Sequence, residues 1–164
     1  MKVPQLREGL SDIAVIMRKD DLYDEIKGVL SAQVQCVLAT VDNSQPCLHL
    51  MAYGFSESLG EIYLASYADT RKVRNMLIQS EVGLLWDNRT GSHHDHIAGF
   101  ALNASGKARM LDGACYNSAS RLLLDRNPTL EALLSSDNTA VFSVAVTSYV
   151  FAKGYTSVYE FQPD

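Results

Sequence analysis

A stretch of alternating side chains, residues 97–111, constrains the fold of this chain more than any other feature. Its even-numbered positions are small or apolar, and its odd-numbered positions turn polar from Asn103 to Arg109. Successive side chains of a β-strand point to opposite faces, so this pattern predicts a long strand with one buried face. Gly106 lies within the apolar face and predicts a bulge or bend at that point.

The other predicted elements surround this strand with a meander and a few helices. Helical spacing of apolar residues predicts helices over 20–32, 71–80 and 114–125, and Asn127-Pro128 predicts a short helix to about Ser135. Short or alternating apolar runs between turns predict further strands over 36–42, 47–55, 61–67, 82–86, 139–152 and 156–161. This order lacks the β-α-β alternation of a doubly wound sheet. It favours one domain over 1–164, mainly β, in which six to seven strands form a small antiparallel barrel with peripheral helices.

The same patterns predict which side chains are buried. The two N-terminal helices present apolar stripes, the strand over 139–152 presents one apolar face, and the only tryptophan, Trp86, suits the core or a dimer interface. Thr70 or Asp69 is expected to cap the helix over 71–80. The expected core positions are Leu22, Ile26, Val29 and Leu30, then Val73, Met76 and Leu77, and finally Ala140, Phe142, Val144, Val146 and Val150.

Composition narrows the class of function. Hydrophobic residues make up 47% of the chain, charged residues 20%, and the formal net charge is −5, which argues against nucleic acid as the main partner. The apolar runs 13–17 and 139–152 are too short for a leader or a membrane span, so we expect no membrane partner and a cytoplasmic location. Cys36, Cys47 and Cys115 lack metal-like spacing and are expected to be small buried side chains.

A basic cluster follows the predicted strand 61–67. No lysine or arginine occurs between Gly28 and Thr70, and then Arg71, Lys72 and Arg74 arrive together at the start of a helix. Cations are unfavourable in the first turn of a helix, because the N-terminus already carries partial positive charge. The same turn offers free backbone N–H groups, so the cluster suits a phosphate. A solvated helix end explains the charges equally well at this point.

The order of the surrounding segments resembles the pyridoxamine 5′-phosphate oxidase-like family of FMN-binding split β-barrels. The resemblance covers roughly residues 22–111 and rests on an ordered set of short motifs. These are Ala39-Thr40, Gln45-Pro46, Cys47 to Tyr53, Ile62 to Ser66, Thr70-Arg71-Lys72 and Gly106-x-Ala108.

The resemblance implies a split antiparallel β-barrel and an FMN-dependent oxidoreductase acting on a small molecule. By position, Thr70, Arg71 and Lys72 would hold the FMN phosphate with Ser66 nearby, while the flavin would lie along His49, Leu50, Met51 and Ala52. Family members are usually homodimers with FMN in the interface, so a two-fold dimer is implied. A nicotinamide cofactor or another reduced flavin could donate electrons.

Departures from the family pattern affect the expected reaction. This chain has His49 and about Gly54 where the oxidases have basic residues, Ala101 where they have glutamine, and no C-terminal tryptophan or Arg-x-His segment. These departures argue against pyridoxamine 5′-phosphate as the substrate. No residue pattern identifies a catalytic residue.

Two alternatives to a flavin enzyme remain open. One is a haem-binding or haem-degrading barrel that uses His49 or a histidine of the loop His93, His94 and His96. The other is a flavin-binding redox module without turnover. The loop histidines do not follow the usual spacing of metal ligands, so a solvated loop is favoured and no metal is expected.

Overall fold

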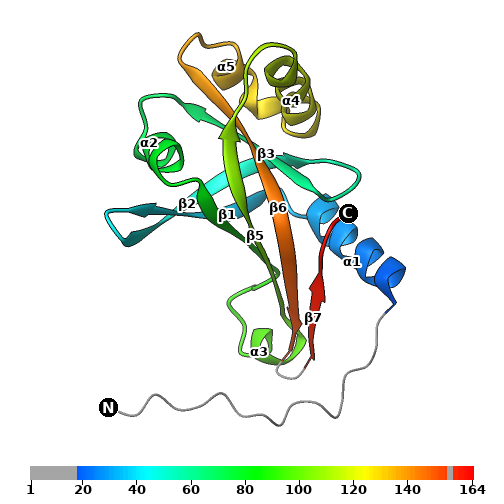
Figure 1. Cartoon of the computed structure of the whole chain (residues 1–164). Coiled ribbons are helices and arrows are strands. Elements are labelled where there is room, and N and C mark those ends of the chain that lie inside the picture. The colour runs from blue at the N-terminus through cyan, green and yellow to red at the C-terminus, as the bar shows by residue number, and fades with distance from the viewer. Residues whose placement is uncertain (1–17, 155–156) are drawn as a thin grey trace.

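One antiparallel sheet, curled into a barrel, forms the body of the structure (Figure 1). The computed structural model describes residues 18–154 and 157–164. The strands within these residues are β1 (Gln35–Asp42), β2 (Gln45–Phe55), β3 (Glu61–Tyr67), β4 (Glu81–Asp87), β5 (Phe100–Met110), β6 (Thr139–Lys153) and β7 (Ser157–Phe161). They are ordered β3-β2-β1-β4-β5-β6-β7, and β3 also pairs with β6. Six strands therefore close a barrel and β7 lies outside it, which confirms the predicted fold class.

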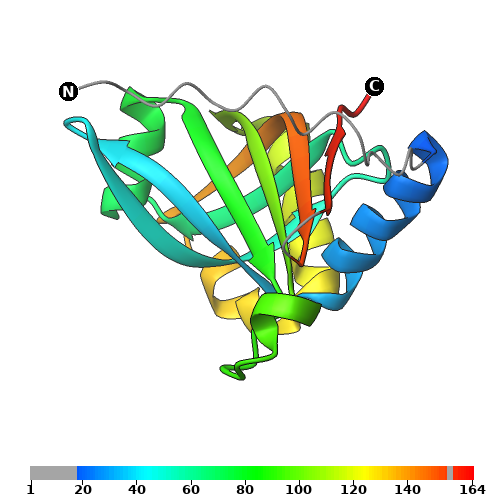
Figure 2. The same cartoon turned by 90° about the horizontal axis from the view of Figure 1, so that it is seen from below.

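The helices lie around the barrel at different places (Figures 1 and 2). They are α1 (Lys19–Ala32), α2 (Arg71–Ile78), α3 (Asp95–Ala98), α4 (Gly113–Arg126), α5 (Glu131–Leu134) and the 3-10 turn η1 (Pro128–Leu130). In both views α2 lies beside the β1–β2 hairpin, on the side away from α1. Figure 1 shows α4 and α5 at the opposite end of the barrel from α3. No helix among the described residues is long and apolar enough to cross a bilayer.

The barrel interior is the main apolar core. Leu38, Tyr53, Trp86, Leu102 and Phe142 are almost fully buried in it, and α2 adds Val73 and Met76. The prediction that Trp86 belongs to the core is confirmed. A smaller cluster lies on the outer face of β3 and β6, where α4 and α5 cover the sheet. Both faces of β6 are therefore buried over its first half, Ala140 to Val144.

A bulge between β5 and β6 changes the alternation of β6. Gly106 pairs with Val146, whereas the preceding residue Ser105 pairs with Ser148, so one extra residue is inserted in β6. A Cβ atom on Gly106 would lie 2.5 Å from the carbonyl oxygen of Ala145, which explains the glycine. Beyond the bulge the buried face switches to Tyr149 and Phe151, and Val150 is 37% exposed. The predicted bulge is confirmed, and the predicted burial of Val150 is wrong.

Several predicted boundaries and buried positions need smaller corrections. The strand predicted over 97–111 begins at Phe100, because residues 95–98 form α3 and Gly99 follows it. The turn predicted over 43–46 contracts to Asn43 and Ser44, whose φ angles of 47° and 67° suit a two-residue hairpin. Leu77 is 58% exposed, because α2 buries only the Val73 and Met76 side of its stripe. Val29 is only half-buried at the edge of the core.

The cysteines do not share one environment. Cys36 is buried as predicted, whereas Cys47 is half-buried and Cys115 is exposed on α4, so the expectation fails for these two. Burial raises the pKa of the Cys36 thiol to about 12. The apolar run 13–17, which the sequence analysis considered as a leader, lies outside the described residues.

Arg126 at the end of α4 joins three elements. Its guanidinium lies 4.9 Å from the ring centre of Tyr53 and 5.0 Å from that of Phe55, both on β2. It donates hydrogen bonds to the carbonyl oxygens of Leu30 and Gln33 at the end of α1. The Tyr53 hydroxyl donates to the same two carbonyls. We call Arg126, Tyr53 and Phe55 the α4 clasp, because together they hold α1 and α4 against β2.

Candidate functional site

The barrel is split along one edge of β2. Strand β2 pairs with β1 over residues 45–52, but it pairs with β3 only from Tyr53 to Phe55. The end of β3, Ala65 to Tyr67, pairs with β6 on its other side. Within the described residues 45–67, the first half of β2 therefore has backbone N–H and C=O groups with no strand partner on the β3 side. An open strand edge of this kind can hydrogen-bond a ligand along its length.

The N-terminus of α2 lies beside this open edge, directly after β3 (Figure 2). Thr70 occupies the N-cap position, as predicted, but its side chain makes no capping hydrogen bond. Its hydroxyl instead donates to the carbonyl oxygen of Tyr67 at 2.9 Å and lies 3.1 Å from the hydroxyl of Ser66. The first-turn N–H groups of α2 are thus left without a side-chain cap, which suits an anion.

The side chains at this helix end converge from β3 and α2. Lys72 Nζ donates to Ser66 Oγ at 3.1 Å, and Ser66 is buried. Arg71 is exposed, and within the described part of the chain it makes no ion pair or hydrogen bond. Arg74 is different, since its guanidinium lies 3.5 Å from the carboxylate of Asp42. Two cations therefore remain beside uncapped N–H groups without a protein anion.

A chain of polar side chains, Asn75, Thr40 and His49, links α2 to β1 and β2 behind the site. Asn75 Nδ2 donates to Thr40 Oγ1 at 3.0 Å, and Thr40 Oγ1 lies 3.1 Å from Nε2 of His49. Thr40 and Asn75 are buried. Burial lowers the pKa of His49, and the charges of Lys72 and Arg71 lower it further. The histidine at the open edge of β2 is thus within electrostatic reach of both cations.

The structure brings most of the predicted site residues together, but on different faces. His49 and Met51 point to the inner face of β2, with Met51 buried, and Ala52 is half-buried. Leu50 points outward and is 69% exposed, and its neighbour Leu48 is 70% exposed. Because a strand alternates, Leu50 can contribute only its backbone to the edge that His49 shares.

Sequence reasoning gave no role to Asn75, and Thr40 entered only as part of a motif. Asn75 is one of the buried positions of α2, together with Val73 and Met76. A buried asparagine needs a polar partner, and here the partner is a strand residue far away in the sequence. An amide next to the apolar stripe of a predicted helix is a weak signal, so the sequence could not have shown this contact.

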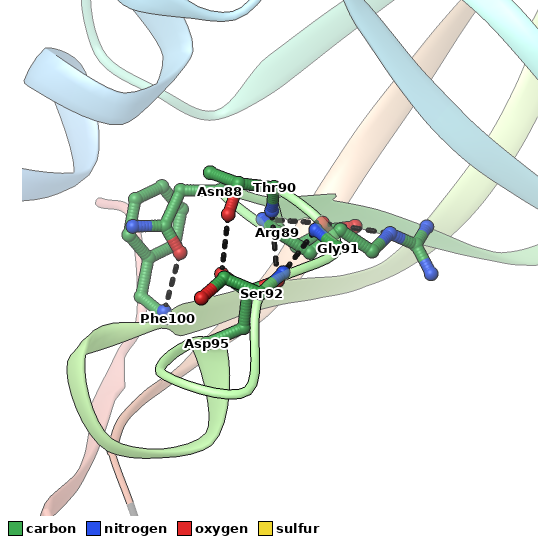
Figure 3. Close-up of polar contacts among 8 residues, drawn as sticks. Asn88, Arg89, Thr90, Gly91, Ser92, Asp95 and Phe100 are labelled. Atoms are coloured by element: carbon green, nitrogen blue, oxygen red, sulfur yellow. Dashed lines mark hydrogen bonds and ion pairs between the residues drawn. The ribbon is translucent and has the colours of Figure 1, made fainter.

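The loop that carries the three histidines has its own internal order (Figure 3). The carboxylate of Asp95 accepts the backbone N–H groups of Thr90, Gly91 and Ser92 and the hydroxyl of Thr90. Desolvation opposes the ionisation of Asp95, but these hydrogen bonds prevail and lower its pKa. A cavity of about 530 Å³ lies beside this loop and the outer face of β4 and β5, lined in part by His93 and His96. Among the described residues, no three potential metal ligands lie close enough to hold an ion.

A sequence profile described as pyridoxamine 5′-phosphate oxidase matches residues 22–149, most of the chain. The chain belongs to the pyridoxamine 5′-phosphate oxidase-like family. The match confirms the predicted resemblance and extends it beyond residue 111 through α4, η1, α5 and most of β6. No protein of curated function matches the chain.

Solved structures share the fold at low sequence identity. A haem-binding protein from Mycobacterium smegmatis has a TM-score of 0.75 at 16% identity over 85% of this chain and 57% of that one. HutZ, a haem storage protein from Vibrio cholerae, has a TM-score of 0.66 at 16% identity over 87% and 94% of the two chains. A putative pyridoxamine 5′-phosphate oxidase from Listeria innocua has a TM-score of 0.62 at 16% identity over 78% and 95%. At this identity the likeness shows the fold alone.

Proposed function

We propose that this protein is an FMN-dependent oxidoreductase that acts on a small molecule, with the FMN phosphate at the N-terminus of α2. The single observation that carries the proposal is the pair of cations, Arg71 and Lys72, beside uncapped N–H groups and without a protein anion. Phosphate oxygens accept hydrogen bonds from all of these donors. The hydroxyls of Ser66 and Thr70 lie beside Lys72 at the same helix end.

The open edge of β2 supports the rest of the cofactor. In the proposal, the backbone of His49 to Ala52 hydrogen-bonds the ribityl chain and ring, in place of the missing β3 partner. Bound FMN would supply hydride and electron transfer, which no side chain of the protein can provide. The protein residues would fix the phosphate, orient the ring along β2 and limit access of water to one face.

The proposal extends to a two-fold dimer. Leu48 and Leu50 project from the outer face of β2 with about 70% of their surface exposed. A neighbouring pair of large apolar side chains suits a protein interface. We propose that a second copy covers them next to the flavin, and light scattering of the parent and of Leu50→Glu tests this. A monomeric parent would contradict the dimer.

We also propose a cytoplasmic location, which the three free cysteines support.

Reconstitution with two flavins tests the phosphate assignment. The parent protein should bind FMN more tightly than riboflavin, which lacks the phosphate, as measured by quenching of flavin fluorescence. Lys72→Ala or Arg71→Ala should weaken FMN binding about tenfold or more, because hydrogen bonds to charged groups contribute about 1.5–3 kcal/mol. Riboflavin affinity should change little in either variant.

Arg74→Ala is the matched control for this experiment. Arg74 lies on the same helix, but its charge is directed at Asp42. Its loss should leave FMN affinity close to that of the parent. Equal FMN affinity in the parent, Lys72→Ala and Arg71→Ala would contradict the phosphate site. Steady-state oxidation of NADH or NADPH with small acceptors then separates an oxidoreductase from a flavin-binding redox module that does not turn over.

Haem binding is the second candidate, and one observation favours it. His93 lines the cavity of about 530 Å³ between its loop and the outer face of β4 and β5, and two structural neighbours are described as haem proteins. Titration with haem distinguishes the candidates, because a bound haem gives a strong Soret band that flavin lacks. Loss of that band in His93→Ala, with FMN binding unchanged, would identify the loop as the haem ligand.

A further inference from the structure

A second cavity lies far from the split, between α4 and the outer face of the barrel. It measures about 300 Å³, at the lower end of the ~300–1,000 Å³ typical of small-molecule sites. Its polar wall comes from β3, β5 and β6. Its other wall comes from α4 and from Leu111, which lies just before α4. The candidate FMN residues of β2 and α2 do not line it.

Glu61 provides a fixed negative charge in this cavity. One of its carboxylate oxygens accepts the hydroxyl of Tyr63 at 2.6 Å, and the other accepts the hydroxyl of Ser143 at 2.9 Å. Ser143 is buried in the sheet, so the carboxylate is anchored from below. An ionised carboxylate offers about four acceptor positions, so two remain for a ligand.

Tyr63 remains a hydrogen-bond donor over the physiological range. Burial raises the pKa of its phenol to about 12, and the hydrogen bond to Glu61 acts in the same direction. The phenol of Tyr63 therefore stays protonated near neutral pH and keeps donating to Glu61.

Arg109 provides a positive charge on the same polar wall, two strands away from Glu61. The sheet register places Arg109 opposite Ser143 on β6, and Ser143 opposite Tyr63 on β3. Neighbouring strands lie about 4.8 Å apart, so the Arg109 backbone is about 10 Å from that of Tyr63. Within the described residues the Arg109 side chain has no ion pair or hydrogen bond, and it is exposed. A cation and an anchored anion thus face one cavity without pairing with each other.

The remaining wall is mainly apolar, although Ser118 of α4 also lines it. Leu111 and Ala119 are buried, and Leu122 is half-buried beside them. Cys115, in the first turn of α4, lines the same cavity and is exposed. A ligand that fits this wall needs a small apolar group in addition to its charges.

We propose that this cavity binds a zwitterionic amino acid with an apolar side chain. The ammonium group would donate to Glu61, the carboxylate would accept from Arg109, and the side chain would lie against Leu111 and Leu122. A ligand with both charges fits better than a simple anion or cation, because it pairs with Glu61 and with Arg109, whereas either alone would pair with only one of them. The site is independent of flavin binding, so it goes beyond the function proposed above.

Alkylation of Cys115 provides a direct measurement, because a ligand in the cavity shields this thiol. The protein is treated with iodoacetamide in the presence of L-leucine, and peptide mass spectrometry reads Cys115 separately from Cys47. L-Leucine should protect Cys115 at millimolar concentration. N-Acetyl-L-leucine lacks the ammonium group and L-leucinamide lacks the carboxylate, so each should need about tenfold more or fail to protect.

Variants assign the two charges to their protein partners. Arg109→Gln should weaken protection by L-leucine about tenfold and leave protection by L-leucinamide unchanged, since the amide has no carboxylate to lose. Glu61→Gln should weaken L-leucine binding and leave N-acetyl-L-leucine unchanged. Arg121→Gln, an exposed arginine of α4 outside the cavity, is the matched control and should behave as the parent.

Two results would overturn the proposal. One is the absence of protection by L-leucine in the parent protein, with Cys115 reacting at its full rate. The other is equal protection by L-leucine and its two capped derivatives, which would show that the cavity recognises only the apolar group. Circular dichroism of each variant verifies that the fold is retained.

Discussion

The α4 clasp and the split both place arginine or lysine against the barrel, but they treat the charge in opposite ways. At the clasp, Arg126 lies over two aromatic rings and donates to carbonyl oxygens at the end of α1. At the split, Arg71 and Lys72 lie where α2 already carries partial positive charge, and they have no carboxylate partner among the described residues. The clasp thus pairs one guanidinium NH₂ group of Arg126 within the chain, although the buried Nε of Arg126 has no hydrogen-bond partner among the described residues. At the split the cations lie beside uncapped N–H groups of a helix, and this combination is the basis of the phosphate proposal.

The largest expected effect is at the clasp. Arg126→Ala removes charged hydrogen bonds and two ring contacts and leaves the carbonyls of Leu30 and Gln33 with fewer donors. We expect the free energy of unfolding to fall by about 2–4 kcal/mol in urea titrations. Arg121→Ala, on the exposed side of the same helix, should change it by no more than about 0.5 kcal/mol. A similar small change for Arg126→Ala would show that the clasp is dispensable.

The second largest effect is expected for the polar chain of Asn75, Thr40 and His49 beside the split. Thr40→Val keeps the shape of the side chain but removes the acceptor of the Asn75 amide and the partner of His49. An unsatisfied buried group costs about 1–3 kcal/mol, so we expect a loss of stability in that range. Chemical denaturation of the apoprotein measures it. The double variant Thr40→Val with Asn75→Leu should recover part of the loss, because no buried donor is then left unpaired.

Substitution of Arg71 should change the stability of the apoprotein in the opposite direction from substitution of Arg126. Arg71→Gln removes a cation from the first turn of α2, so the apoprotein should become more stable by about 0.3–1 kcal/mol. The same variant should bind FMN more weakly, as proposed above. A loss of apoprotein stability would mean that Arg71 supports the fold, and the contrast with Arg126 would then disappear.

The smallest expected effect is the pH dependence contributed by His49. Its pKa is lowered in the folded protein, by burial first and then by Lys72 and Arg71, from an ordinary value near 6.5. A lowered histidine pKa favours the neutral form, so its contribution to stability is present above pH 6.5 and is lost as the pH falls through the folded-state pKa. Titration of the imidazole by NMR should find this pKa raised towards its ordinary value in Lys72→Ala. An unchanged His49 pKa would show that Lys72 does not act on it.

The barrel class and most element positions along the chain could be predicted, because periodicity and turn residues are local patterns. Alternation gave the long β5, a glycine within it marked the bulge, and apolar spacing gave α1, α2 and α4. The ordered set of short motifs, Thr70-Arg71-Lys72 among them, predicted the family, which the match over residues 22–149 confirms. The assignment of these residues to an FMN phosphate stays a prediction.

The failures have physical reasons that a local pattern does not contain. The bulge inserts a residue in β6, so every later side chain changes face and Val150 becomes exposed. The carboxylate of Asp95 accepts backbone N–H groups of the histidine loop, and Asp95 begins the short helix α3. Residues 95–98 are therefore helical, so the strand is shorter than predicted. The burial of Leu77 depends on which side of α2 contacts the barrel, and strands far away in the sequence determine that side.

The sequence by itself determined the periodicities, the basic cluster after a strand and the order of motifs, because these depend on residues close together in the chain. Only the tertiary structure decided which charges are satisfied. It placed Arg126 over Tyr53 and turned the Thr70 hydroxyl away from the α2 N–H groups. It also placed Glu61 and Arg109 in the lining of one cavity. Such placement depends on strand register and helix docking, which bring together residues that no local pattern connects.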